Sequence, residues 1–388
     1  MPLYSRTALF TALVAVVSLV YTVSWLRRVR QRRIFARARG CVEPPHYKHA
    51  DPLFGLLEMV DMIKAGKSHT FLERIQNLYD KYGNTFVSSP IFGTRTVNTI
   101  EPESLESILS SDFQSFAVST FRKPAMLPFL GDKSIVVLDG HEWKKVRTMY
   151  RHGLERDSSQ DCARFETYFQ QLIQVLPKDG SPVNLIRPFF TLAGDITLDF
   201  MFGQEGNTFK RPVEDQDQFY ASLQRVQLGC EERYRLGWLA DLVPMKDFKR
   251  SVKVIHQFLQ QHVESALRLG RASDKSGESV TKDPSSSKRR NMLEILAGVS
   301  SDRVAIRTGL ADILVGGRDT TASLLTDLFF EISKRPDVWK KIREEVSELD
   351  GKLPGSKDLS SLTYVKWCIQ ECKFSCPWCC RLGVKSSI

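Results

Sequence analysis

The chain has 388 residues, of which 42% are hydrophobic, and a formal net charge of +10. This length allows two or three domains, and the composition allows a sizeable buried core. Eight arginines and no acidic residue precede Gly40, so the rest of the chain carries only +2. That distribution argues against a nucleic-acid-binding groove.

An uncharged run of nineteen residues, Ala8–Leu26, precedes seven of these arginines. At about 1.5 Å per helical residue, the run just crosses a bilayer core of about 30 Å. A cleaved signal peptide is the alternative, but no A-x-A-like site follows and the arginines lie on the C-terminal side. The positive-inside rule therefore predicts an uncleaved transmembrane helix at 8–26. It implies a single-pass protein of the endoplasmic reticulum membrane, with lipid as a partner and the globular part in the cytosol.

Residues 27–52 form a basic linker that Pro44, Pro45 and Pro52 stiffen. Helical spacing of apolar residues predicts a helix within 69–83, with Gly83 as its end. Two β-prone runs around a Pro/Gly turn predict a hairpin over 84–100, and the following residues 102–111 return to helix.

From there the patterns are mainly helical, with predicted helices within 142–154, 164–176, 190–203, 217–229 and 247–270. The last of these has an apolar stripe formed by Val252, Ile255, Leu259, Val263 and Ala266. Residues 271–290 are polar and rich in serine and lysine, which predicts a mobile surface loop rather than a domain boundary. The fold class is therefore mainly α with a small β element.

The stretch 313–332, ILVGGRDTTASLLTDLFFEI, has polar residues and glycines in the middle of a helical pattern. Asp302 is a candidate cap for a helix that begins near Arg303 and runs to about Lys334, before Pro336. A glycine costs roughly 1 kcal/mol in a helix interior, and a buried carboxylate costs more unless it has a partner. The weakening of a core helix at this point indicates a functional site.

We expect the Thr320 hydroxyl to bond the carbonyl of Gly316, which would bend and locally widen the helix. Gly316 and Gly317 would then leave bare backbone against which a flat ligand could lie. Asp319 and Thr320 offer an acid and a hydroxyl that can relay protons beside it. On spacing alone, a kinked core helix with a satisfied Asp319 remains an equal alternative.

The segment GGRDTT resembles the [A/G]-G-x-[D/E]-T-T motif in the distal helix of cytochrome P450 monooxygenases. The wider LADILVGGRDTTA is similar to the fungal microsomal alkane and fatty-acid hydroxylase branch. DGHEWKKVR resembles the family's W-x-x-x-R helix, and KRPDVWKKIREEVSEL and LSSLTYVKWCIQE resemble the segments that follow the distal helix. The resemblance covers about residues 8–371. It implies an incomplete cytochrome P450-like fold at 53–371 behind the N-terminal transmembrane helix.

The resemblance implies a haem cofactor and the site residues that go with it. Trp143 and Arg147 would hold a haem propionate, with His141 as a weaker candidate for the same contact. Asp319 and Thr320 would carry protons to dioxygen, beside Gly316 and Gly317. Arg318 is expected to be structural or to lie near the helix exterior.

The implied reaction is insertion of one oxygen atom into an apolar small molecule. Fatty acids, alkanes and intermediates of fungal secondary metabolism are the candidate substrates. NADPH–cytochrome P450 reductase would supply the electrons.

The pattern departs from the family near its C-terminal end. Glu371 matches the first residue of a structural E-x-x-R motif, but Phe374 stands where that motif has arginine. No F-x-x-G-x-R-x-C loop is present in the sequence, so the axial cysteine is missing and we expect the chain as written to be inactive. Residues 372–388 form an aberrant cysteine-rich tail. A reading-frame change, a retained intron or a degraded gene would explain it.

Five of the eight cysteines lie in the last 21 residues, and free thiols are expected for a cytosol-facing chain. Cys376, Cys379 and Cys380 lack the flanking residues of a haem-thiolate loop. A zinc site formed by Cys368, Cys372, Cys376 and Cys379 has suitable spacing in part. A non-catalytic, membrane-tethered remnant or pseudogene product is the alternative function. The basic segment 27–39 alone would fit a binder of anionic lipid headgroups.

Overall fold

The computed structural model describes residues 3–48, 56–68, 70–88, 95–154, 159–203, 213–276 and 291–375. They belong to two compact units, Met1–Ser111 and Asp112–Ile388, which we call unit 1 and unit 2. The predicted domain at 53–371 spans the boundary between them.

Unit 1 contains a small hairpin and mostly short helices. Its elements are α1 (Leu3–Ala38), α2 (Leu56–Lys67), α3 (Phe71–Tyr82), β1 (Thr85–Ser88), β2 (Thr96–Thr99), α5 (Pro102–Glu106) and the π-helix η1 (Ser107–Ser111). β1 and β2 pair antiparallel with Thr85 opposite Thr99, which confirms the predicted hairpin. Gly83 ends α3 with a φ of 86°, a left-handed conformation that glycine adopts without strain.

The predicted transmembrane helix is not confirmed. Within the described part of the chain, no helix is both long and apolar enough to cross a membrane. α1 includes 8–26, but the side chains of residues 1–15 lie outside the described part of the chain.

Unit 2 is almost entirely helical. Its elements are η2 (Phe113–Ser115), α6 (Arg122–Leu130), α7 (Gly140–Leu154), α8 (Ser159–Val175), α9 (Ile186–Phe202), α10 (Val213–Leu236), η4 (Gly237–Asp241), α11 (Lys246–Ser276), α12 (Met292–Val299), α13 (Arg303–Ser333), α14 (Pro336–Ser347), α15 (Ser356–Ser361) and α16 (Thr363–Ser375). This content confirms the mainly α prediction, and it includes α6 and α12, which the sequence analysis did not predict.

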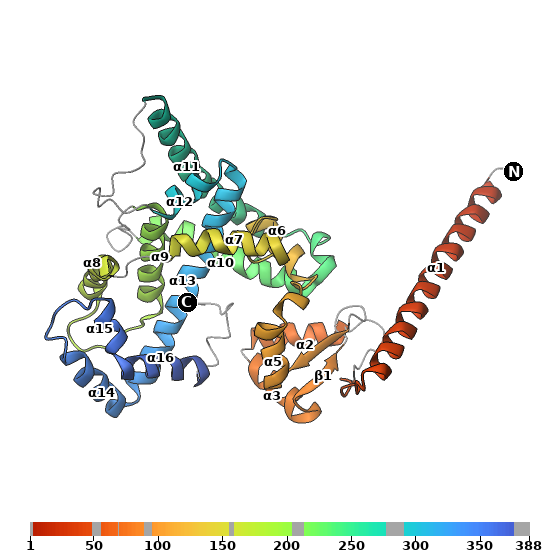
Figure 1. The fold of residues 1–388 in the computed structure, drawn as a ribbon, viewed down its shortest axis with the longest axis horizontal. Helices are drawn as coiled ribbons and strands as arrows, with labels where there is room; N and C mark the ends of the chain where they lie inside the picture. Colours follow the sequence, from red (N-terminus) through yellow and green to blue (C-terminus); the bar gives the residue numbers. More distant parts are fainter. Residues whose placement is uncertain are drawn as a thin grey trace. The chain divides into compact units, whose positions relative to one another are not determined.

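The long helix α13 runs through the middle of unit 2, beside α9 and in contact with α11, α12 and α16 (Figure 1). Its apolar side faces a core to which α10, α11 and α12 also contribute. Fully buried members of that core include Leu223, Ile255, Leu259, Met292 and Leu310. The apolar stripe predicted for α11 thus faces this core, apart from Ala266, which is partly buried against it.

The polar segment 271–290 is partly different from the prediction. α11 continues to Ser276. Residues 271–276 contain no glycine or proline that would end the helix. The rest of the predicted loop, 277–290, lies outside the described residues.

Candidate active site

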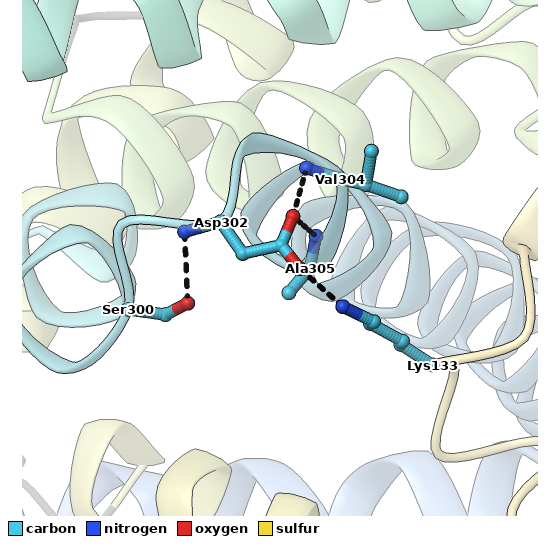
Figure 2. Close-up of polar contacts among 5 residues, drawn as sticks. All are labelled: Lys133, Ser300, Asp302, Val304 and Ala305. Carbon is cyan, nitrogen blue, oxygen red and sulfur yellow. Dashed lines mark hydrogen bonds and ion pairs between the residues drawn. The ribbon is translucent and has the colours of Figure 1, made fainter.

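α13 begins at the cap that the sequence predicts. One oxygen of Asp302 accepts hydrogen bonds from the N–H groups of Val304 at 2.9 Å and Ala305 at 3.3 Å. The other oxygen pairs with the ammonium group of Lys133, and the Asp302 N–H donates to Ser300 (Figure 2). The Lys133 hydrogen bond is the main reason why the pKa of Asp302 is lowered. The start of the helix is therefore tied to the segment between α6 and α7.

The predicted bond between Thr320 and Gly316 is present. The Thr320 hydroxyl donates to the Gly316 carbonyl at 2.6 Å. Both residues are exposed, and a Cβ added at Gly316 would meet nothing within 4 Å. This side of α13 is therefore open, and it offers bare backbone beside a hydroxyl group.

The expected widening of the helix does not occur. α13 is a continuous α-helix from Arg303 to Ser333. A carbonyl oxygen has two lone pairs, so that of Gly316 can accept the Thr320 hydroxyl and keep its backbone partner.

Gly317, unlike Gly316, faces a neighbouring helix. A Cβ at Gly317 would lie 2.7 Å from the hydroxyl oxygen of Thr197 on α9. Its lack of a side chain thus permits the close contact of α13 with α9, whereas the lack of one at Gly316 leaves open space.

Asp319 is buried, and its partners lie away from the open side. One carboxylate oxygen accepts from Arg318 at 2.8 Å, and the other accepts from the amide of Gln227 on α10. Arg318 is only 7% exposed and pairs with Asp319, so of the two expectations for this residue the structural one holds and a place near the helix exterior does not. Its guanidinium lies 4.5 Å from the ring centroid of Tyr220 and 5.0 Å from that of Phe190, which provides the apolar and aromatic cover that a buried arginine needs.

On α7, Trp143 and Arg147 contact each other. The Arg147 guanidinium lies 5.2 Å from the Trp143 ring, as the i, i+4 spacing requires, and Phe113 packs on the same ring at 5.2 Å. Arg147 is exposed, so its cation is available to an anion. His141 is also exposed, and its ring nitrogen lies 3.5 Å from the Glu142 carboxylate.

A buried polar cluster that the sequence analysis missed connects α7 to α13. The carboxylate of Asp312 accepts hydrogen bonds from the Ser134 hydroxyl, the Ile135 N–H at 3.0 Å and the Tyr150 hydroxyl at 2.9 Å. Burial raises the pKa of Asp312 to about 6. The available signal was a carboxylate within the apolar run LADIL, four residues before Gly316.

The C-terminal predictions fall at the edge of the described part. Glu371 is exposed on α16, and Cys372 is buried. The side chain of Phe374 and the residues Cys376, Cys379 and Cys380 lie outside the described part. Where side chains are described, no group of three or more His, Cys, Asp or Glu could hold a metal ion.

These elements define a helical protein built around one long helix with a polar centre and an open side. The sequence profile of the cytochrome P450 family matches residues 45–372, so the chain belongs to the cytochrome P450 family.

Three known relatives illustrate the match. The chain is 33% identical over 367 residues to the cytochrome P450 monooxygenase himC of Aspergillus japonicus, covering 93% of this chain and 64% of the relative. It is 30% identical over 378 residues to the monooxygenase fsdH of Fusarium heterosporum, covering 94% and 64%. It is 29% identical over 354 residues to cytochrome P450 52A13 of Debaryomyces hansenii, covering 87% and 66%. The chain thus spans about two thirds of the length of these relatives.

Proposed function

We propose that this chain forms the distal and propionate-binding sides of a haem monooxygenase that acts on an apolar small molecule. The observation that carries the proposal is the open side of α13. There the exposed Gly316 and Thr320 lie on the helix that the buried cluster ties to α7, which bears Arg147 and Trp143.

The residues present fit one face and the edge of a haem. Gly316 has space for a flat ring, because a Cβ there would meet no atom within 4 Å. Arg147 offers an exposed guanidinium, whose planar fork matches a carboxylate such as a propionate. Trp143 supports that guanidinium through its ring face.

A bound haem supplies the activation of dioxygen that monooxygenation requires. The Thr320 hydroxyl can exchange its bond to Gly316 for one to a ligand and so donate a proton. Asp319 provides an acidic group one residue away, held by Arg318 and Gln227. The substrate is proposed to be a fatty acid, an alkane or a related apolar metabolite, and NADPH–cytochrome P450 reductase is proposed as the electron donor. Both rest on family membership and on the resemblance of LADILVGGRDTTA.

Haemin titration of the purified chain, followed by the Soret absorbance, tests the cofactor site. Arg147→Ala should weaken binding roughly tenfold or more, because a hydrogen bond to a charged group contributes about 1.5–3 kcal/mol. Lys145→Ala is the matched control, since it removes the same charge from the other side of α7. Absence of saturable binding by the wild-type chain, or equal losses in the two variants, would refute the haem site.

We also propose that the chain is tethered to the endoplasmic reticulum membrane by residues 8–26. The support is the uncharged run itself and the arginines that follow it, of which Arg28 and Arg32 are exposed on α1. Deletion of residues 1–39 should move the protein from the membrane fraction to the supernatant. A variant that stays membrane-bound would contradict the tether.

A further inference from the structure

The carboxylate of Asp312 joins three parts of unit 2 at one buried point. Asp312 is 8% exposed on α13. Its donors Ser134 and Ile135 lie between α6 and α7, and its third donor, Tyr150, lies on α7. Within the described residues, no lysine or arginine forms an ion pair with it, so hydrogen bonding alone accounts for its contacts.

The two helices each present a row of residues that starts at this point. Spacings of three and four residues place side chains on one helix face. The α7 row consists of Trp143, Arg147 and Tyr150. The α13 row consists of Asp312, Gly316 and Thr320. The hydrogen bond from Tyr150 to Asp312 therefore links one end of the α7 row to one end of the α13 row.

We propose that Asp312 is a positioning residue that fixes the distance and rotation of the α7 row relative to the α13 row. This inference rests on the haem site proposed above, because the two rows contain the residues assigned to the propionate and to the distal side. The polar contacts of Asp312 are with Ser134, Ile135 and Tyr150, so it would act through these residues and not directly on the cofactor or the substrate. Loss of its contacts should leave Arg147 and Thr320 in place on their helices but no longer held at one separation.

The chemistry of the donors explains why a carboxylate is suited to this position. Its two oxygens can accept several hydrogen bonds at once. The Ile135 N–H can only donate, whereas the hydroxyls of Ser134 and Tyr150 can also accept. An asparagine would therefore retain most of the contacts, with its carbonyl on Ile135 and its amide on a hydroxyl group. A leucine of similar size would retain none.

The test compares haemin binding and hydrogen exchange in four purified chains. Asp312→Leu removes the hydrogen bonds to Ser134, Ile135 and Tyr150, and Asp312→Asn should retain most of them. Leu310→Ala destabilises the same helix without removing a polar contact. Leu310 is fully buried in the core. Circular dichroism is first used to identify conditions in which all four chains are folded. Exchange of the Ile135 amide, measured without haemin, reports its hydrogen bond to Asp312 directly.

We expect Asp312→Leu to weaken haemin binding about tenfold or more, as misplaced binding groups lose affinity. It should also speed exchange at Ile135. Asp312→Asn should stay close to wild type in both measurements, and Leu310→Ala should keep wild-type affinity. If Asp312→Leu does not fold, Tyr150→Phe, which removes a single hydroxyl, takes its place.

The outcomes separate this inference from the haem site. Wild-type binding with equal losses in Asp312→Leu and Leu310→Ala would overturn the positioning role and leave the haem site standing. Unchanged exchange at Ile135 in Asp312→Leu would overturn it as well. A wild-type chain that binds no haemin refutes the haem site and with it the positioning role.

Discussion

The buried carboxyl group of Asp312 should make the stability of unit 2 depend on pH. Burial raises its pKa from an ordinary value of 3.8 to about 6, against the lowering effect of the hydrogen bonds from Ser134, Ile135 and Tyr150. At a pH between these two pKa values, the carboxyl group of Asp312 keeps its proton in the folded state and loses it in the unfolded chain. The contribution of Asp312 to the free energy of unfolding should therefore fall as the pH rises from about 4 to about 6 and should change little above that.

The size of the effect follows from the shift. A raised pKa of about two units corresponds to about 3 kcal/mol, at about 1.4 kcal/mol per unit. Asp312→Asn has no group that titrates at this position and keeps an acceptor for the Ile135 N–H. Relative to wild type, the variant should therefore gain most of this, about 2 kcal/mol in unfolding free energy, between pH 4 and pH 7.

Urea unfolding of both chains at pH 4, 5, 6 and 7, followed by tryptophan fluorescence, measures this difference. Subtracting the unfolding free energy of wild type from that of the variant at each pH removes the contributions of the titrating groups that the two chains share. A difference that is constant over this range would mean that the three donors balance the cost of burial. If the unfolding free energy of the variant instead fell relative to wild type as the pH rises, the three donors would stabilise the ionised carboxylate.

The other predictions concern the glycine pair and the helix cap. Gly317→Ala places a Cβ 2.7 Å from the Thr197 hydroxyl oxygen and should cost about 1–3 kcal/mol. Gly316→Ala meets no atom within 4 Å and should stabilise by about 0.5–1 kcal/mol; equal shifts in thermal unfolding would contradict the contrast. Asp302→Ala, which removes the carboxylate cap, should cost about 0.5–2 kcal/mol. Lys133→Met leaves the cap and removes an exposed ion pair, so chemical denaturation should show a loss below about 1 kcal/mol; a larger loss than for Asp302→Ala would assign the stability to the pair.

Features that depend on neighbours in the sequence were predictable. The cap at Asp302 and the bond from Thr320 to Gly316 involve residues at most four apart, so helix geometry fixes them before any packing is known. The contact of Trp143 with Arg147 has the same origin. The hairpin was also predictable, because its two β-prone runs lie close together in the sequence, on either side of a Pro/Gly pair.

Features that depend on packing between distant segments could not be predicted from the sequence. Asp312 reaches Ser134 across a separation of 178 residues, and no periodicity in either segment encodes that pairing. The difference between Gly316 and Gly317 depends on where α9 lies against α13, which the motif itself does not specify. The burial of Arg318 depends likewise on Phe190 and Tyr220, which come from two other helices.

Asp319 and Thr320 differ in how firmly their side chains are held, and this decides which of them can move in the proposed site. Successive helix residues point about 100° apart, so Asp319 faces α10 while Thr320 faces the open side. Freeing Asp319 would break a buried pair with Arg318 and a contact with Gln227, at a cost of about 3–5 kcal/mol. Rotating the Thr320 hydroxyl away from Gly316 breaks a single exposed bond, which contributes about 0.5–1.5 kcal/mol. In the proposed site, a proton on this side of α13 would therefore be delivered by rotation of the Thr320 hydroxyl, with Asp319 remaining in place.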